Sequence, residues 1–375
     1  MGVEPLLGER LIGRIPVRNL WLLMLYASDL TRFRSEFNGL VDSDSADLPD
    51  LVAELLTKAV EQRLRRNLTR GYRHREMALT RVRGRIDVLE TASRLLLQRG
   101  EVFCRFEELT IDTPRNQLVR SALALLGRVV RRGPLSGRCR SLASGLARAG
   151  VSGRRPSRAD LAPDQIGRND APDRLMIALA QLAFDLALPT EEAGATALVA
   201  PDREEAWVRR LFEKAVLGFA RFEMEPVGWC VRGGSPIHWQ QSSASAAISG
   251  ILPRMVTDIV LDPPYGGRRL IVDTKFTSIL RSGRFGGATL KSEYIYQIYS
   301  YVRSQEGLGA EWDGCGGLLL HPSIDLAFDE HVVIQAHMIR FATVNLGGSV
   351  AAIREELLRI LAGDSPTAPR GLSLQ

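Results

Sequence analysis

The sequence predicts an α/β fold of the α+β kind, arranged as two domains. The chain has 375 residues, 45% of them hydrophobic, which is enough to bury two cores. In its second half a helix, two antiparallel strands, a helix and a strand follow one another, the pattern of helices packed on a sheet. Charge separates the halves, because residues 58–158 carry a net charge of +16 and residues 201–375 carry −1. We therefore expect a mixed α/β N-terminal domain over 1–200 and a separate α/β domain over 201–375.

Composition and motifs exclude several classes of protein. The apolar run over residues 20–26 is too short to cross a bilayer, no longer one exists, and the N-terminus lacks the layout of a secretory signal. The four cysteines form no CxxC pair, and the five histidines show no paired ligand spacing, so we expect no disulfide framework and no zinc site. Without a Walker A or GxGxxG motif, any nucleotide chemistry has to come from a partner. A cytoplasmic protein without membrane contact is the expectation.

The N-terminal half is expected to be mainly helical. Asp50 is placed to cap one helix, and Thr113-Pro114 marks the turn before another. In order, we expect a buried helix over 15–30, a polar link over 36–50, a helix over 51–68, a segment over 75–96 that changes from alternation to helical spacing after Gly84, a strand, turn and helix over 101–132, an irregular connection over 133–173 and a helix near 174–187.

The C-terminal half begins with an amphipathic helix over 203–223. Its apolar residues Trp207, Leu211, Ala215 and Phe219 fall at i, i+4 spacing on one face. After it we expect a polar loop rich in Ser and Ala, a hairpin over 255–276, a Gly-rich loop over 281–292, a tyrosine-rich helix over 293–305, strands over 315–323 and 332–339, and a helix over 348–361.

Two aspartates and a lysine interrupt the otherwise apolar strands of the expected hairpin. Because alternate residues of a strand share a face, Asp273 and Lys275 point the same way. A hairpin symmetric about Tyr265-Gly266 places Asp258 directly opposite Asp273. Like charges in such a pair destabilise a hairpin, and a divalent cation such as Mg²⁺ would remove that penalty. A surface hairpin with polar strand ends is the alternative.

Three further residue positions point to the same chemistry. The lysine at 275 is unusual in this chain, because only four of the 49 basic residues are lysines. A partly buried lysine near a metal can lose or shuttle a proton, whereas an arginine stays protonated. Glu213, on the helix before the hairpin, either reaches the metal from outside the sheet or is a solvated acid beside Lys214. Gln297 and Tyr301 are four residues apart and share one helical face. The tyrosines of that helix are either core aromatics or the rim of a DNA site.

Six segments, in order along the chain, carry a resemblance to known proteins. They are 15-IPVRNLWLLMLYA-27, 106-FEELTIDTPRNQLVRSAL-123, 211-LFEKAV-216, 252-LPRMVTDIVL-261, 271-IVDTKF-276 and 297-QIYSYV-302. The last four resemble the PD-(D/E)xK nuclease superfamily, in its branch with a QxxxY helix. The whole set is similar to the McrC family, the nuclease subunits of McrBC-type, 5-methylcytosine-dependent restriction systems.

The resemblance implies a PD-(D/E)xK restriction-endonuclease-like core in the C-terminal domain and a partner-docking or DNA-proximal role for the N-terminal domain. The superfamily's Pro-Asp dipeptide is Thr257-Asp258 here, which retains the aspartate. The implied reaction is Mg²⁺-dependent hydrolysis of phosphodiesters in double-stranded DNA. In it Asp258 and Asp273 would hold the metal, Lys275 would orient or activate water, and Glu213, Gln297 and Tyr301 would take supporting positions.

The resemblance also implies a partner. This would be an McrB-like AAA+ GTPase ring that reads the modified cytosine and whose GTP hydrolysis this chain would stimulate. The basic block over 58–158 would then grip either DNA or the ring, and the sequence does not choose. Two alternatives are a non-cleaving adaptor that activates an AAA+ GTPase, and a free-standing exonuclease of the RecB or Cas4 kind. Intact Asp258, Asp273 and Lys275 argue against the adaptor, and dispersed cysteines and an unexplained N-terminal half argue against the exonuclease.

Overall fold

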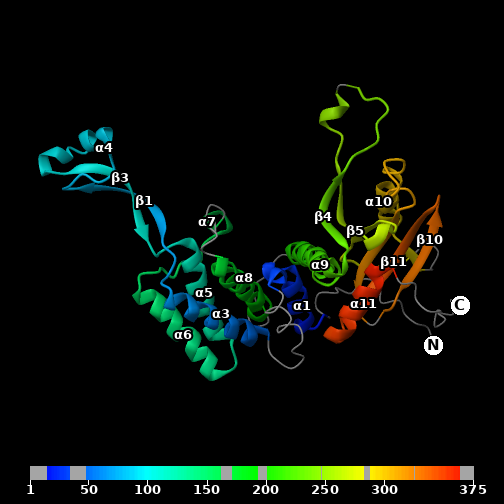
Figure 1. The fold of residues 1–375 in the computed structure, drawn as a ribbon, viewed down its shortest axis with the longest axis horizontal. Helices are drawn as coiled ribbons and strands as arrows, with labels where there is room; N and C mark the ends of the chain where they lie inside the picture. Colours follow the sequence, from blue (N-terminus) through cyan, green and yellow to red (C-terminus); the bar gives the residue numbers. More distant parts are fainter. Residues whose placement is uncertain are drawn as a thin grey trace. The chain divides into compact units, whose positions relative to one another are not determined.

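A computed structural model of the chain describes residues 15–33, 48–161, 171–192, 201–245, 247–282, 288–324 and 326–363. They form two compact units (Figure 1). Unit 1 comprises residues 1–44 together with 192–375, and unit 2 comprises residues 45–191. The helices and the mixed sheet confirm the expected α/β class.

The N-terminal helix belongs to the C-terminal unit, which corrects the expected division into residues 1–200 and 201–375. Helix α1 (Val17–Ala27) packs against α9 (Pro201–Met224), where the ring of Tyr26 lies edge-on to an aromatic ring of α9, with centroids 5.2 Å apart. Gly218 permits this approach, because a Cβ there would lie 1.9 Å from the Tyr26 carbonyl oxygen. Asn19 donates two hydrogen bonds, of 2.7 and 2.9 Å, to backbone carbonyls near the start of the last helix. The apolar run is therefore buried on unit 1.

A six-stranded mixed sheet forms the core of unit 1. Its strand order is β10-β11-β9-β6-β5-β4, with β6, β9 and β11 parallel and the other neighbours antiparallel. The expected single strand over 332–339 is wrong, because the chain turns at Gln335 and Ala336, both with positive φ. The strands are β4 (Cys230–Ile237), β5 (Met255–Asp262), β6 (Leu270–Thr274), β9 (Gly316–Ser323), β10 (Asp329–Ile334) and β11 (His337–Asn345).

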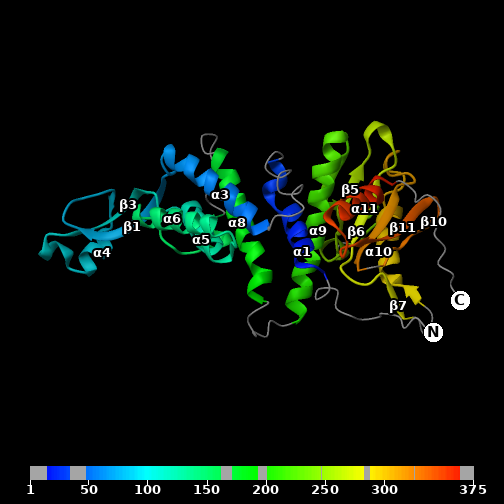
Figure 2. The ribbon, with the colours of Figure 1, turned by 90° about the horizontal axis from the view of Figure 1, so that it is seen from below.

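Helices cover both faces of this sheet (Figures 1 and 2). Helices α9 and α11 (Val350–Ala362) contact one another and lie on one face. Helix α10 (Ser292–Arg303) lies on the other, where Ile298 packs into a cluster with Ile271 and Leu319. The expected Gly-rich loop contains a short hairpin of β7 (Leu280–Ser282) and β8 (Ala288–Leu290), and its residues 283–287 lie outside the description. Of the expected apolar face of α9, Leu211, Ala215 and Phe219 are buried, while the Trp207 side chain lies outside the description.

Unit 2 is a group of helices that carries a long β-ribbon. Strands β1 (Gly71–Leu79) and β3 (Val102–Thr110) pair antiparallel over their whole length, and Figure 1 shows them projecting beyond the helices with α4 at the far end. The remaining elements of unit 2 are α3 (Leu48–Arg65), β2 (Arg85–Ile86), α4 (Val88–Ser93), α5 (Pro114–Val129), α6 (Gly133–Arg148), α7 (Arg158–Leu161), α8 (Ala171–Glu192) and a 3-10 helix at Leu96–Arg99. In unit 1, 3-10 helices occur at Asp29–Arg32, Glu225–Val227, Ile248–Gly250 and Pro264–Gly266.

Two expectations for unit 2 are wrong. Asp50 caps no helix, because α3 already begins at Leu48; its carboxylate instead accepts hydrogen bonds from Arg131 N at 3.1 Å and Arg132 Nε at 3.0 Å. Most of 133–173 is not irregular, since α6 fills its first part and buries small and apolar residues at helical spacing, namely Leu135, Cys139, Ala143 and Leu146. Residues 162–170, and most of the expected link over 36–50, lie outside the described part of the chain.

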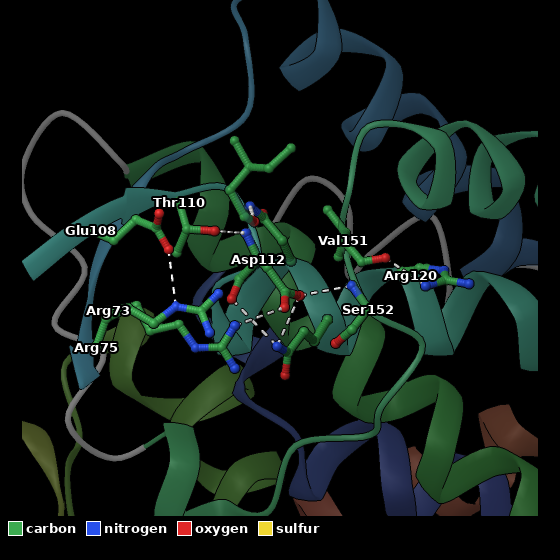
Figure 3. Close-up of polar contacts among 11 residues, drawn as sticks. Arg73, Arg75, Glu108, Thr110, Asp112, Arg120, Val151 and Ser152 are labelled. Atoms are coloured by element: carbon green, nitrogen blue, oxygen red, sulfur yellow. Dashed lines mark hydrogen bonds and ion pairs between the residues drawn. The ribbon is translucent and has the colours of Figure 1, made fainter. Parts of the chain in front are cut away.

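A polar network around Asp112 joins the ribbon to the helices of unit 2 (Figure 3). Its Oδ1 accepts hydrogen bonds from Ser152 N at 2.7 Å and Gln117 Nε2 at 2.9 Å, and its Oδ2 lies 3.4 Å from Arg73 of β1. Burial alone would raise the pKa of Asp112, but these hydrogen bonds and the Arg73 charge outweigh it and lower the pKa. Thr113 then caps α5, as its position before proline predicts.

Candidate active site

Asp258 and Asp273 lie on adjacent strands of the sheet. The ladder of β5 and β6 pairs Ile259 with Val272, and the next step in that register sets Asp258 opposite Asp273, as expected. Asp273 is 1% exposed, and neither of its oxygens accepts a hydrogen bond among the described residues. Asp258 is half-buried, and its Oδ2 accepts hydrogen bonds from Thr274 N at 2.7 Å and Thr274 Oγ1 at 2.9 Å. A buried carboxylate without donors requires a positive partner.

Lys275 supplies one positive charge. Its Nζ lies 2.7 Å from Asp273 Oδ2, in an ion pair whose angles are not those of a hydrogen bond. The same Nζ donates a hydrogen bond to Gln297 Oε1 at 3.0 Å, and the backbone N–H of Lys275 donates to Leu320 O at 2.9 Å. The side chain is 18% exposed, so the expectation of a partly buried lysine is confirmed. Its position is fixed from both β9 and α10.

Helix α10 supports the lysine through two of the expected residues. Gln297 Nε2 donates to Tyr301 Oη at 2.7 Å, which confirms that the two share a helical face. Burial raises the pKa of the Tyr301 phenol, so it stays protonated. Of the tyrosines of this helix, Tyr301 is buried, as the core interpretation expects, and Tyr296 is 69% exposed.

Electrostatics within the site favour a bound cation. Burial raises the pKa of Asp273 to about 6; the Lys275 charge opposes this, and the charges of Asp258 and Glu213 add to it. Burial also raises the pKa of Glu213, and the charge of Asp258 raises it further. Three carboxylates thus repel one another around one ammonium group. A divalent cation would reverse that repulsion.

The donor set fits a hard cation held by two carboxylates. Magnesium usually binds one or two carboxylates and completes its octahedron with water and phosphate oxygens. Asp258 and Asp273 offer that set, and the hydrogen-bond-free oxygens of Asp273 are the observation that supports it. No group of three or more His, Cys, Asp or Glu side chains in the described ranges is placed to share a metal ion. Glu213 lies close enough for its charge to raise the pKa of Asp273.

Sequence reasoning missed three residues beside Lys275. His321, buried on β9, has its Nδ1 2.8 Å from Thr277 O, and because a carbonyl only accepts, Nδ1 carries the proton. Burial lowers the pKa of His321 to about 4, so the ring is neutral at pH 7. The Tyr294 ring lies 6.0 Å from this imidazole, and Lys275 and Lys291 both lie over the Tyr294 ring. The available signal was Lys291 itself, one of only four lysines.

The fold and the site together define an α/β protein with a carboxylate–lysine centre, the arrangement expected from the resemblance to restriction nucleases. Residues 5–322 match the family described as McrBC 5-methylcytosine restriction system component. The chain belongs to this family.

The chain is also similar to individual known proteins. The chain is 28% identical over 348 residues to the Type IV methyl-directed restriction enzyme EcoKMcrBC of Escherichia coli (strain K12), covering 92% of this chain and 97% of the relative. It is also similar to a half-complex of Thermococcus gammatolerans McrB AAA+ hexamers with bound McrC, with a TM-score of 0.43, 13% identity and coverage of 91% of this chain and 76% of that chain. A second structure, of the Thermococcus gammatolerans McrBC complex, has a TM-score of 0.32, 14% identity and coverage of 52% and 63%. Scores this low do not bear on the fold.

A membrane-spanning helix needs both length and high hydropathy. None of the helices of the described residues is both long enough and apolar enough to cross a bilayer.

Proposed function

We propose that this chain is the Mg²⁺-dependent DNA endonuclease subunit of a 5-methylcytosine-dependent restriction complex. The observation that carries the proposal is the buried, hydrogen-bond-free Asp273, opposite Asp258 and 2.7 Å from Lys275. Membership of the McrBC family supports the restriction role. A structural hairpin would gain nothing from a carboxylate that burial makes costly to ionise.

In this proposal the residues have separate tasks. Asp258 and Asp273 would hold Mg²⁺, which when bound would stabilise charge on the phosphate and lower the pKa of a water ligand. Thr274 holds Asp258 in place through its two hydrogen bonds. Gln297 fixes the ammonium of Lys275 beside Asp273, where it can orient the water or stabilise negative charge that develops on the phosphate. Tyr301 in turn fixes Gln297.

The proposed partner is an McrB-like AAA+ GTPase ring that reads the modified cytosine in double-stranded DNA. Family membership and the absence of a Walker A motif from the sequence support a division in which the partner hydrolyses GTP and this chain stimulates it. The E. coli relative, a methyl-directed restriction enzyme, supports the choice of modified DNA as substrate.

The test is cleavage of methylated and unmethylated plasmid by the full chain with its co-encoded AAA+ partner, GTP and Mg²⁺. Wild type should cut methylated plasmid only. Lys275→Ala should lose cleavage by two orders of magnitude or more, on the order of the loss of one charge-stabilising group, while GTP hydrolysis stays stimulated. The matched control is Arg303→Ala, which removes an exposed cation from the end of α10, the helix that supports Lys275. This variant should retain both DNA cleavage and stimulation of GTP hydrolysis.

Two results would overturn the proposal. If Lys275→Ala cuts DNA as fast as wild type, the hairpin that carries Lys275 takes no part in cleavage. A wild type that stimulates GTP hydrolysis but never cuts would make the chain an adaptor.

A further inference from the structure

Lys291 is a second lysine beside the carboxylate centre. It directly precedes α10, and its side chain is half-buried. Within the described part of the chain no ion pair joins it to an acid; its recorded contact is with the face of Tyr294, 5.2 Å from Nζ to the ring centroid. A half-buried ammonium group that no carboxylate neutralises is available to bind an anionic ligand.

Tyr294 brings Lys291 and Lys275 together. The Nζ of Lys275 lies 5.1 Å from the same ring centroid, so the two ammonium groups are no farther apart than the sum of these two distances. The electron-rich face of a tyrosine attracts each cation and restricts where it can lie. The ring itself is held against the core of the sheet and by the neighbouring His321 ring.

The pKa of His321 also reflects the charges of Lys275 and Lys291. Burial is the main cause of its low pKa, and the charges of Lys291 and Lys275 both lower it further. Both ammonium groups therefore act on one imidazole. Because that imidazole is neutral, it adds no repulsion to the pair. The surroundings of Tyr294 thus hold two positive charges, of which only Lys275 has an acid beside it.

We propose that Lys291 binds a DNA phosphate next to the scissile one, and that Tyr294 is the positioning residue that sets its spacing from Lys275. The proposal rests on the proposed nuclease function, because it takes the Lys275 side of the ring as the place of the scissile phosphate. Phosphates of one strand are spaced about 3.4 Å apart along the helix axis. Two ammonium groups that share one ring lie close enough together to contact neighbouring phosphates of a single strand. The proposed ligand is therefore the phosphate backbone of DNA, and binding should not depend on the base sequence.

Binding is measured first, with the full chain, double-stranded DNA and no divalent metal, over a series of salt concentrations. Lys291→Ala should weaken binding at every sequence and reduce the slope of log K against log salt by about one, the loss of a single phosphate contact. Lys291→Arg should restore the slope, because it keeps the charge. Arg303→Ala removes a cation of the same helix and should leave the slope unchanged.

Cleavage in the full complex then separates positioning from binding. Lys291→Ala should raise KM several-fold with little change in kcat, because the contact is made before and during the reaction. Tyr294→Phe keeps the ring and should behave as wild type. Tyr294→Leu removes it and should lower kcat as well, since Lys275 loses its place.

The outcomes distinguish this inference from the nuclease proposal. If Lys291→Ala shows wild-type slope and KM while Lys275→Ala is inactive, the second phosphate contact is wrong and the nuclease centre stands. If Lys275→Ala cuts normally, the nuclease proposal fails, and the inference fails with it. If Lys291→Arg does not restore the slope, the lysine is a packing residue and not a phosphate contact.

Discussion

At the scale of single residues, the burial of Asp273 disfavours its charged form. Its pKa of about 6 in the folded chain exceeds the unfolded value of about 4. The folded state therefore binds this proton more tightly than the unfolded state does. The resulting stabilisation is fully present below pH 4 and is lost as the pH rises through 6.

Asp273→Asn removes this pH dependence. The amide has a similar shape and can still lie against the ammonium group of Lys275, but it never carries the charge. Without metal, the variant should gain stability over wild type as the pH rises from 4 to 7.5, by at most about 2–3 kcal/mol. Denaturant unfolding of both proteins in a metal chelator, at pH 4 and pH 7.5, measures the difference. An equal difference at both pH values would contradict the pKa of Asp273.

The sequence predicts part of this site for a definite reason. Asp258, Asp273 and Lys275 lie within one hairpin. There the alternation of side chains along a strand determines which residues share a face, and the position of the turn determines which residues pair. Lys291 and His321 come from the start of α10 and from β9, so no local period links them to Lys275. Their proximity depends on the parallel pairing of β6 with β9, which the sequence pattern does not encode.

At the scale of elements, the contact of α1 with α9 depends on one glycine. Gly218→Ala would place a methyl group against the Tyr26 backbone, which cannot move aside as a flexible side chain can. We expect a loss of about 1–3 kcal/mol of unfolding free energy, the range for overpacking.

Gly137→Ala in α6 is the matched control. A Cβ at Gly137 meets nothing within 4 Å, so a helical Gly-to-Ala change should stabilise by about 0.4–1 kcal/mol. Urea unfolding of both variants beside wild type makes the comparison. A Gly218→Ala protein as stable as the Gly137→Ala protein would contradict the close packing of α1 on α9.

Helices with clear apolar spacing or a start signal could be predicted from the sequence. Thr113-Pro114 marks the start of α5, and the helix begins there. Helix α6 was missed because glycine and serine dilute its apolar spacing. The turn at Gln335 and Ala336 was missed because neither residue is usual at positive φ, where glycine and asparagine dominate.

At the scale of the whole molecule, the two units differ in net charge. Unit 2 contains the block of net charge +16, and part of that charge is paired internally, as in Arg138 with Glu61 and Arg105 with Asp87. Three of the four lysines belong to unit 1, and two of them lie over Tyr294 in the candidate site. In the proposed function the phosphate chemistry takes place in unit 1, while the arginines of unit 2 would provide a wider positive field for DNA or for the partner.

The measurement that tests the central claim most directly is the location of Mn²⁺ by anomalous scattering in crystals of the full chain, for wild type and Asp273→Asn. Manganese takes the same carboxylate and water ligands as magnesium and is visible by its own signal. We expect one strong peak between Asp258 and Asp273 in wild type and none there in Asp273→Asn. A wild type with that position empty and Mn²⁺ bound elsewhere, or equal peaks in both proteins, would contradict it.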